Sequence, residues 1–213
     1  GILTAAVGIL GFFIIKEPEV KPVKDSYLGS ILYGFRPKTV KENPKLYLSL
    51  LAFIVFNISI QIFMPYLIIY YQVSLNMKDY VLIMAPAIII ASVLTAFWGK
   101  VYDKKGFGFS LSFSLLSLSA GYVILFIFKS TIPVFVGSLL MMSGYLSGMA
   151  VFGAKIRDNT PLGKAGRLQG VRIVSQVLIP GIVGPFISKQ VLKNAPQILG
   201  NDADEIVRFA NQC

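Results

Sequence analysis

Long apolar runs separated by short polar connectors dominate this chain. A helix needs about 20 residues to cross the hydrocarbon core of a membrane, and five runs approach or exceed that length: residues 46–71, 80–98, 109–128, 132–154 and 168–188. They lack the polar alternation of a barrel strand, and a helix satisfies its own backbone in lipid. The pattern therefore predicts five transmembrane helices, and consecutive helices should be antiparallel because the connectors are short.

The remaining stretches surround these spans. Residues 1–15 are apolar but short, so we expect the end of a transmembrane helix whose start is missing. Residues 16–45 form a polar linker, in which Ser26–Phe35 has the amphipathic pattern of a helix on the membrane surface. Asn43 is expected to cap the helix of the first span. Residues 193–213 are expected to be a tail outside the cell, followed by a last helix that is missing.

Lysine and arginine concentrate in alternate connectors. Residues 16–45, 99–108 and 155–172 carry fifteen of them, whereas the connectors and the tail on the other side carry five. Connectors rich in lysine and arginine stay in the cytoplasm. We therefore expect a multi-pass protein of the cytoplasmic membrane, with the loops 16–45, 99–108 and 155–167 inside the cell.

Composition agrees with a membrane protein and excludes several classes of function. Hydrophobic residues make up 55% of the 213 residues and charged residues 14%, against about 25% charged residues in soluble domains. The net charge of +10 follows the topology, so the lipid bilayer and not nucleic acid is the expected partner. The sequence has no histidine and one cysteine, Cys213, which excludes an internal disulfide, histidine metal sites and Ser-His-Asp catalysis. No metal or cofactor is expected.

Aromatic and serine residues add detail to the spans. Tyr66, Tyr70 and Tyr71 cluster at one predicted outer end, and Trp98 and Tyr102 lie at an inner end, as is typical of membrane–water interfaces. The third span is rich in serine, which predicts close packing against a neighbouring helix.

The connector GKVYDKKGFG, residues 99–108, concentrates charge and glycine between two apolar runs. Gly99 is expected to let its helix approach a neighbour closely, and Gly106 and Gly108 to allow turn conformations barred to other residues. Asp103 opposes the orientation signal of the lysines, so we expect it to meet a helix N-terminus or a cation.

This connector resembles a signature of the major facilitator superfamily, G-x-x-x-D-(R/K)-x-G, at Gly99, Asp103, Lys104 and Gly106. In that family the signature lies between the second and third helices and, less strictly, between the eighth and ninth. The family usually has two basic residues after the second glycine, and their absence here fits the less strict copy. The resemblance implies that Asp103 forms a charge–dipole lock, which holds the cytoplasmic ends of two helix bundles together while the site faces outward.

A second resemblance lies in RDNTPLGKAGRLQG, residues 157–170. The superfamily often carries D-x-x-P-x-x-x-R-G-x-x-x-G after its fourth or tenth helix. The matching positions are Asp158, Pro161, Gly166 and Gly170, whereas Ala165 stands at the arginine position between two basic residues. We also expect Thr160-Pro161 to start a helix.

Two signatures separated by two spans imply the fold. Residues 46–192 would supply the seventh to eleventh helices of a twelve-helix transporter, hence most of its C-terminal six-helix bundle. This all-α membrane fold would be truncated at both ends, and the missing N-terminal bundle would be its partner. The residues to which the resemblance gives gating roles are Gly99, Asp103, Lys104, Gly106, Arg157, Asp158 and Arg167.

The resemblance implies a secondary transporter that moves a small solute by alternating access. The strings at 43–53 and 177–187 are similar to cation-coupled sugar symporters of the melibiose type, which implies a sugar. A membrane scaffold or sensor on the same fold, and a membrane enzyme, are the alternatives. An enzyme would need acids, histidines or a nucleophile–base pair in the spans, and the sequence has none there.

Four polar residues near the middle of the spans are candidates for contact with the solute, since transporter sites lie near the midplane. Asn57 and Gln61 are four residues apart and share a helix face, where their amides could bind hydroxyl or amide groups. Tyr145 and Gln176 are the other two, and each of the four has packing between helices as its alternative. No charged residue lies deep in a span, so coupling to H⁺ or Na⁺ would use residues outside this sequence, or the protein is a facilitator.

Overall fold

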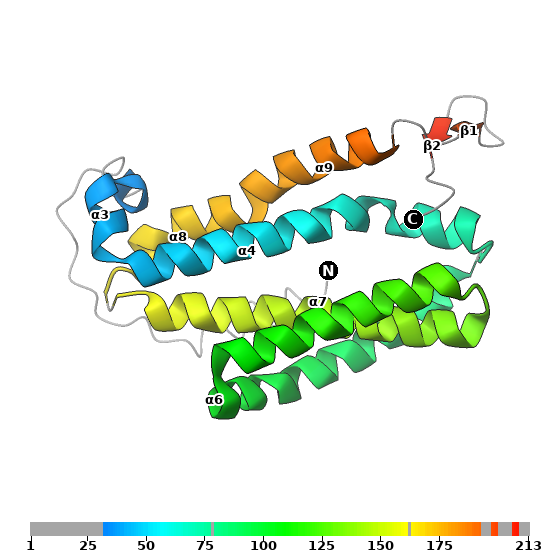
Figure 1. Ribbon diagram of the computed structural model, residues 1–213, viewed down its shortest axis with the longest axis horizontal. Coiled ribbons are helices and arrows are strands. Elements are labelled where there is room, and N and C mark those ends of the chain that lie inside the picture. The colour runs from blue at the N-terminus through cyan, green and yellow to red at the C-terminus, as the bar shows by residue number, and fades with distance from the viewer. Residues whose placement is uncertain (1–31, 78, 162, 193–196, 200–205, 209–213) are drawn as a thin grey trace, which may run out of the picture. The chain divides into compact units, whose positions relative to one another are not determined.

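Helices account for almost all of the part of the chain that the structure describes (Figure 1). The computed structural model describes residues 32–77, 79–161, 163–192, 197–199 and 206–208, which belong to one unit of the chain. The predicted helix end at 1–15 and most of the predicted surface helix at 26–35 lie outside these residues.

Four helical runs in this part are long and apolar enough to cross a membrane. The first contains α4 (Pro44–Phe63), the 3₁₀ turn η2 (Met64–Tyr66), α5 (Leu67–Ile69) and the π-helical turn η3 (Tyr70–Ser74). The second is α6 (Tyr80–Ile127) and the third is α7 (Thr131–Asn159). The fourth contains α8 (Ala165–Ile173), the π-helical turn η4 (Val174–Leu178) and α9 (Ile179–Val191). The predicted helical membrane architecture is confirmed.

Shorter elements flank these runs. The 3₁₀ turn η1 (Leu32–Phe35) and the helix α3 (Pro37–Glu42) precede α4. The strands β1 (Gln197–Leu199) and β2 (Ile206–Arg208) form an antiparallel pair that the apolar pattern does not predict.

The helix α6 doubles back on itself and so matches two of the five predicted spans. One of its 48 residues, Gly106, has a non-helical backbone (φ 77°, ψ −179°), and both arms run from there in the same direction (Figure 1). Trp98 of the first arm stacks on Phe113 of the second with ring centroids 4.3 Å apart, and its indole N–H donates to the carbonyl of Ser110 at 3.3 Å. The prediction of a turn across residues 99–108 is wrong in extent, because the reversal needs only one residue.

Replacing Gly106 with alanine should destabilise this reversal. Only glycine normally occupies its backbone region, and strain of this kind costs about 1–3 kcal/mol. The space around Gly106 is open, so backbone strain and not a clash would cause the loss. We expect a lower apparent melting temperature of the purified protein in detergent, followed by circular dichroism. Gly108→Ala is the matched control because Gly108 is helical with open space around it, and equal losses in both variants would contradict the prediction.

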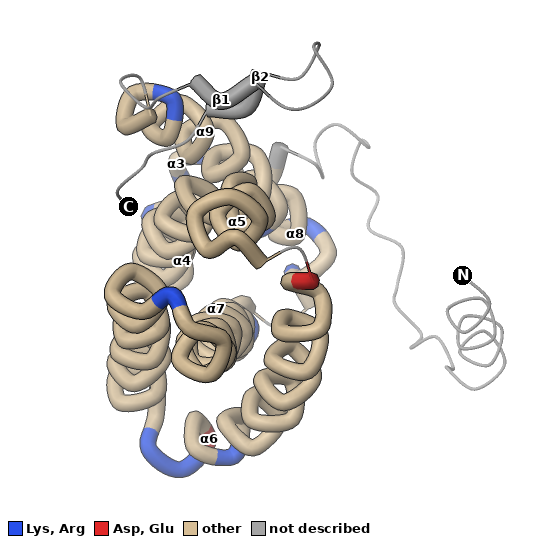
Figure 2. The backbone as a smooth tube through the Cα atoms, turned by 90° about the vertical axis from the view of Figure 1, so that its right-hand side faces the viewer, with Lys and Arg blue, Asp and Glu red and all other residues tan. Residues whose placement is uncertain are grey.

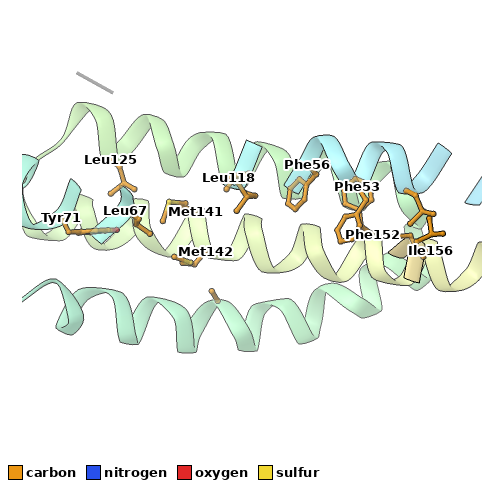
Figure 3. Close-up of a cluster of buried hydrophobic side chains, with 14 of the residues drawn as sticks. Phe53, Phe56, Leu67, Tyr71, Leu118, Leu125, Met141, Met142, Phe152 and Ile156 are labelled. Carbon is orange, nitrogen blue, oxygen red and sulfur yellow. The ribbon is translucent and has the colours of Figure 1, made fainter. Parts of the chain in front are cut away.

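The second arm of α6 packs directly on the backbone of α7. A Cβ on Gly121 would lie 2.4 Å from the backbone nitrogen of Met141, and a Cβ on Gly144 would lie 2.4 Å from that of Leu118. The hydroxyl of Ser117 donates to a backbone carbonyl of α7 at 2.9 Å. The close packing predicted from the serines of the third span is therefore confirmed, and Leu118 and Met141 lie in the resulting core (Figure 3).

The helix α4 joins this pair of helices to α9. Phe53 and Phe56 of α4 lie against Phe152 of α7, with ring centroids 5.2 and 5.4 Å apart (Figure 3). On α9, the hydroxyl of Ser188 donates to the carbonyl of Ile62 in α4 at 2.8 Å. Thus α4 contacts both α7 and α9. These two contacts fix the rotation of α4, and hence the directions in which its mid-span residues Asn57 and Gln61 lie.

Two tyrosines of η3 tie the end of the first helical run to α6 and α7. Tyr71 is fully buried in the core (Figure 3). Its hydroxyl is hydrogen-bonded to that of Ser138 on α7. The hydroxyl of Tyr70 donates to the carbonyl of Leu125 at 2.6 Å. The side chain of Tyr71 thus packs in the protein core and is not exposed, because the π-helical turn η3 lies against the neighbouring helices.

Of two predicted helix starts, one is confirmed in position and one is wrong. Asn43 stands at the N-cap position of α4 with Pro44 after it, as predicted, but its side-chain amide donates to the carbonyl of Thr39 at 2.9 Å and makes no capping hydrogen bond. Thr160 follows the last residue of α7, and its hydroxyl donates to the carbonyl of Ile156 at 2.6 Å. The next helix starts only at Ala165. Both polar side chains bond backward to the preceding turn, so neither makes a capping hydrogen bond to the helix that follows.

Candidate functional site at the basic end of the helices

Four helix ends with lysine and arginine residues meet at one end of the described helices, which we call the basic end. It comprises the first turns of α4 and α8, the last turns of α7 and the turn of α6 around Gly106 (Figure 1). Figure 2 shows the positive charge of α6 collected at this turn. Both sequence signatures lie at the basic end, so the structure brings together segments that are about 50 residues apart in the chain.

Two consecutive residues at the end of α7 hold the basic end together. The carboxylate of Asp158 accepts a hydrogen bond of 2.8 Å from the hydroxyl of Tyr102 on α6. The same carboxylate pairs with the guanidinium of its neighbour Arg157 at 3.3 Å. The side-chain amide of Asn159 donates to the hydroxyl of Ser49 on α4 at 3.0 Å. Asp158 therefore links the two signatures directly, and Asn159 extends the link to α4.

A small cavity of about 170 Å³ lies between the first arm of α6 and α7. Gly99 and Asp103 line it from α6, and Ala154 and Arg157 line it from α7. A Cβ on Gly99 would meet no atom of the described residues within 4 Å, so the predicted close helix approach at Gly99 is not made within these helices. The cavity keeps the two backbones apart there.

The side chains of Asp103 and Lys104, just before the reversal of α6 at Gly106, are exposed. Asp103 forms no hydrogen bond or ion pair with any residue that the structure describes. The predicted contact with a helix N-terminus or a cation is thus not made within these helices. Its carboxylate is available to a partner beyond them.

A larger cavity of about 260 Å³ lies on the other side of Arg157, between α4, the end of α7 and α8. Arg172 of α8 also lines it, and the apolar side chains of Leu50 and Leu168 form part of its wall. Arg157 therefore borders both cavities of the basic end.

The start of α8 is held by the end of the linker. The guanidinium carbon of Arg167 lies 4.1 Å above the ring centroid of Tyr33, and the ammonium of Lys164 lies 5.7 Å from the same centroid. A hydrogen bond with Tyr33 is the main cause that raises the pKa of Lys164 above its usual value. Two cations, Lys164 and Arg167, therefore lie over one ring of η1, and the start of α8 presents positive charge there.

A comparison with protein families accounts for this combination of apolar helices and paired signatures. A family model described as Major Facilitator Superfamily matches residues 1–185. The chain belongs to this superfamily. Its members are membrane transporters, and the chain is accordingly a multi-pass membrane protein with the helices described above. A search of curated proteins and a search of solved structures found no match.

The four mid-span residues predicted to contact solute differ from one another in burial and in contacts. Asn57 is 6% exposed, and its amide donates to the carbonyl of Phe53 in its own helix at 2.8 Å. Gln61 is half-buried and lies against Gly184 of α9. Tyr145 is half-buried beside the core, and Gln176 is half-buried in the π-helical turn η4. None of the four lines either cavity of the basic end.

Three residues of the basic end have contacts there that the sequence does not predict. The sequence pattern predicts Tyr102 at the membrane interface, yet its hydroxyl donates to Asp158. Arg172 lines the larger cavity, and Tyr33 lies under Arg167. Tyr102 lies inside the first superfamily signature, directly before Asp103. This position is the one feature of the sequence that indicates a role for Tyr102 in the site. Arg172 and Tyr33 stand outside both signatures, so only the packing of α8 shows their roles.

Proposed function

We propose that this superfamily member is a secondary transporter that moves a small solute across the cytoplasmic membrane by alternating access. The observation that carries the proposal is the family match over residues 1–185. Transporters of this superfamily consist of two related bundles, which rock against each other around a site near the midplane. The described helices would act as one bundle, and the second would be its partner.

The basic end would form the cytoplasmic gate of this bundle. The link from Tyr102 to Asp158 and Arg157 makes the α6 turn and the end of α7 one unit. The exposed carboxylate of Asp103 projects from that unit with no partner among the described residues. The carboxylate of Asp103 could therefore bind and release the other bundle. The other residues of the gate would be Gly99, Lys104, Gly106 and Arg167.

The half-buried amides of Gln61 and Gln176 are the best candidates for contact with the solute. Both are polar groups near the middle of membrane helices, where an unbonded amide is costly. Both belong to the group α4, η4 and α9, whose members contact one another. Asn57 and Tyr145 would lie behind them, because Asn57 is buried and already bonded to its helix. Hydroxyl-rich solutes such as sugars match this amide chemistry.

Cysteine protection tests this assignment. Gln61→Cys and Gln176→Cys, each in a Cys213→Ser background, should react with a polar maleimide in proteoliposomes, and a transported solute should slow that reaction. Val55→Cys and Val177→Cys are matched controls from the same helical runs, since these valines are 63% and 57% exposed on the apolar surface. Solute should not change their labelling.

Uptake in the same proteoliposomes decides the class of function. A panel of radiolabelled sugars and other small polar solutes would be offered with and without H⁺ and Na⁺ gradients. Accumulation that follows a gradient would establish a symporter, and equilibration without a gradient would establish a facilitator. Protection of the cysteines without any uptake would contradict the transport proposal and favour a sensor on the same fold.

A further inference from the structure

The larger cavity of the basic end brings two guanidinium groups to the same face of α7. A Cβ on Gly153 of α7 would lie 3.6 Å from Nη2 of Arg172, which reaches across from α8. Arg157 is four residues beyond Gly153 and hence on the same helix face. Both arginines line this cavity of about 260 Å³. Two like charges close together favour a bound anion between them.

The other groups around this cavity also suit an anion. No aspartate or glutamate is among the residues that line it. The nearest carboxylate along the chain, Asp158, accepts hydrogen bonds from Tyr102 and from Nε and Nη2 of Arg157, which leaves Nη1 of Arg157 for an anion. Arg172 is half-buried and forms no hydrogen bond or ion pair with any residue in the described part of the chain. Its donors are therefore unmatched by protein acceptors.

The first turn of α8 adds to this positive potential. Ala165, the first residue of α8, lines the cavity, and no side chain caps this helix. The first backbone N–H groups of a helix lack partners within it and attract anions. The side-chain amide of Gln169 supplies further donors at the same wall.

We propose that this cavity binds a phosphate group, carried by an anionic lipid or by a free phosphate compound. Guanidinium groups bind phosphate oxygens in pairs, and basic pockets between membrane helices on the cytoplasmic side bind lipid headgroups. The buried side chains of Leu50 and Leu168 at the cavity wall would contact the apolar part of a lipid. This inference concerns binding alone and does not depend on the proposed transport function.

Binding can be measured on the intact protein in phosphatidylcholine nanodiscs by its apparent melting temperature. Two probes distinguish the sources of phosphate: inorganic phosphate, compared with chloride at equal ionic strength, and replacement of part of the lipid by phosphatidylglycerol. We expect one of them to raise the melting temperature with saturation. An effect of inorganic phosphate would identify a free ligand, and an effect of phosphatidylglycerol alone would identify a lipid headgroup.

Arginine variants locate the site. Arg172→Gln should weaken the apparent affinity about tenfold, because a hydrogen bond to a charged group contributes about 1.5–3 kcal/mol. Arg157→Gln, at an exposed position, tests the same site without disturbing the packing of α8. Arg36→Gln removes an equal charge from an exposed position outside the cavity and should have no effect. Failure of both probes to stabilise the protein, or equal weakening by Arg36→Gln and Arg172→Gln, would overturn the proposal.

Discussion

Gly144→Ala should strongly destabilise the protein, because the added methyl group has no room. Its Cβ would lie 2.4 Å from the backbone nitrogen of Leu118 and 2.7 Å from the carbonyl oxygen of Ser114, both in the second arm of α6. A backbone cannot turn aside as a flexible side chain does, so the two helices would have to separate. Overpacking of this kind costs about 1–3 kcal/mol, and each 1 kcal/mol lowers a melting temperature by about 2–4 °C at this chain length.

The measurement is the apparent melting temperature in detergent, with Gly181→Ala as control. Gly181 lies in α9, and a Cβ there would meet no atom within 4 Å. Gly121→Ala tests the same interface from the other helix, since its Cβ would lie 2.4 Å from the backbone nitrogen of Met141. We expect both interface variants to melt lower than wild type and Gly181→Ala to match it. A Gly144→Ala protein as stable as the Gly181→Ala protein would show that α6 and α7 are farther apart than described.

The apolar runs predict the helices well because a membrane span depends on length and hydropathy alone. The reversal of α6 shows where such reasoning stops. Charge and glycine at 99–108 indicate a loop, yet the helix continues through Lys104 and Lys105. Lysine is a good helix former. The charges of Lys104 and Lys105 therefore favour a position outside the lipid, but these residues do not end the helix. Only Gly106 takes up the backbone conformation that reverses the chain.

Burial in a membrane bundle is harder to predict than the spans themselves. A membrane helix is apolar on all sides, so hydropathy does not reveal which face meets other helices. The register of α4 does contain a hint, because Phe53, Asn57 and Ile60 follow helical spacing and are all buried. This spacing places Asn57 on the buried face of α4, beside the core. Its amide there is bonded to a carbonyl of its own helix. Leu67 and Tyr71 continue this spacing and are also buried, so the spacing, and not aromatic character, indicates the burial of Tyr71.

The candidate gate could be located from the sequence, but its contacts could not. Alternating basic connectors place Asp103 and Asp158 on one side of the membrane, and the structure shows both at the basic end. The donor to Asp158 is Tyr102, which lies 56 residues away on another helix. A contact of this kind depends on the relative register and rotation of two helices. No local spacing records that relation, so only the packed structure contains it.

Asp103→Asn should impair transport while the protein still inserts and folds. The carboxylate forms no hydrogen bond or ion pair within the described helices, so its removal should leave their stability unchanged. If it binds the helix ends of the other bundle, the substitution removes a charge–dipole interaction of up to about 2 kcal/mol. A loss of that size shifts the balance between the two facing states about tenfold or more, and we expect uptake to fall by a similar factor.

Asp79→Asn is the matched control for this experiment. It makes the same chemical change at an exposed aspartate before α6, at the opposite end of the helices. Uptake in proteoliposomes and the apparent melting temperature would be measured for both variants. A gate predicts lost uptake with an unchanged melting temperature for Asp103→Asn and wild-type behaviour for Asp79→Asn. Normal uptake by Asp103→Asn would remove the gating role, and a lowered melting temperature would assign Asp103 a structural role within its own bundle.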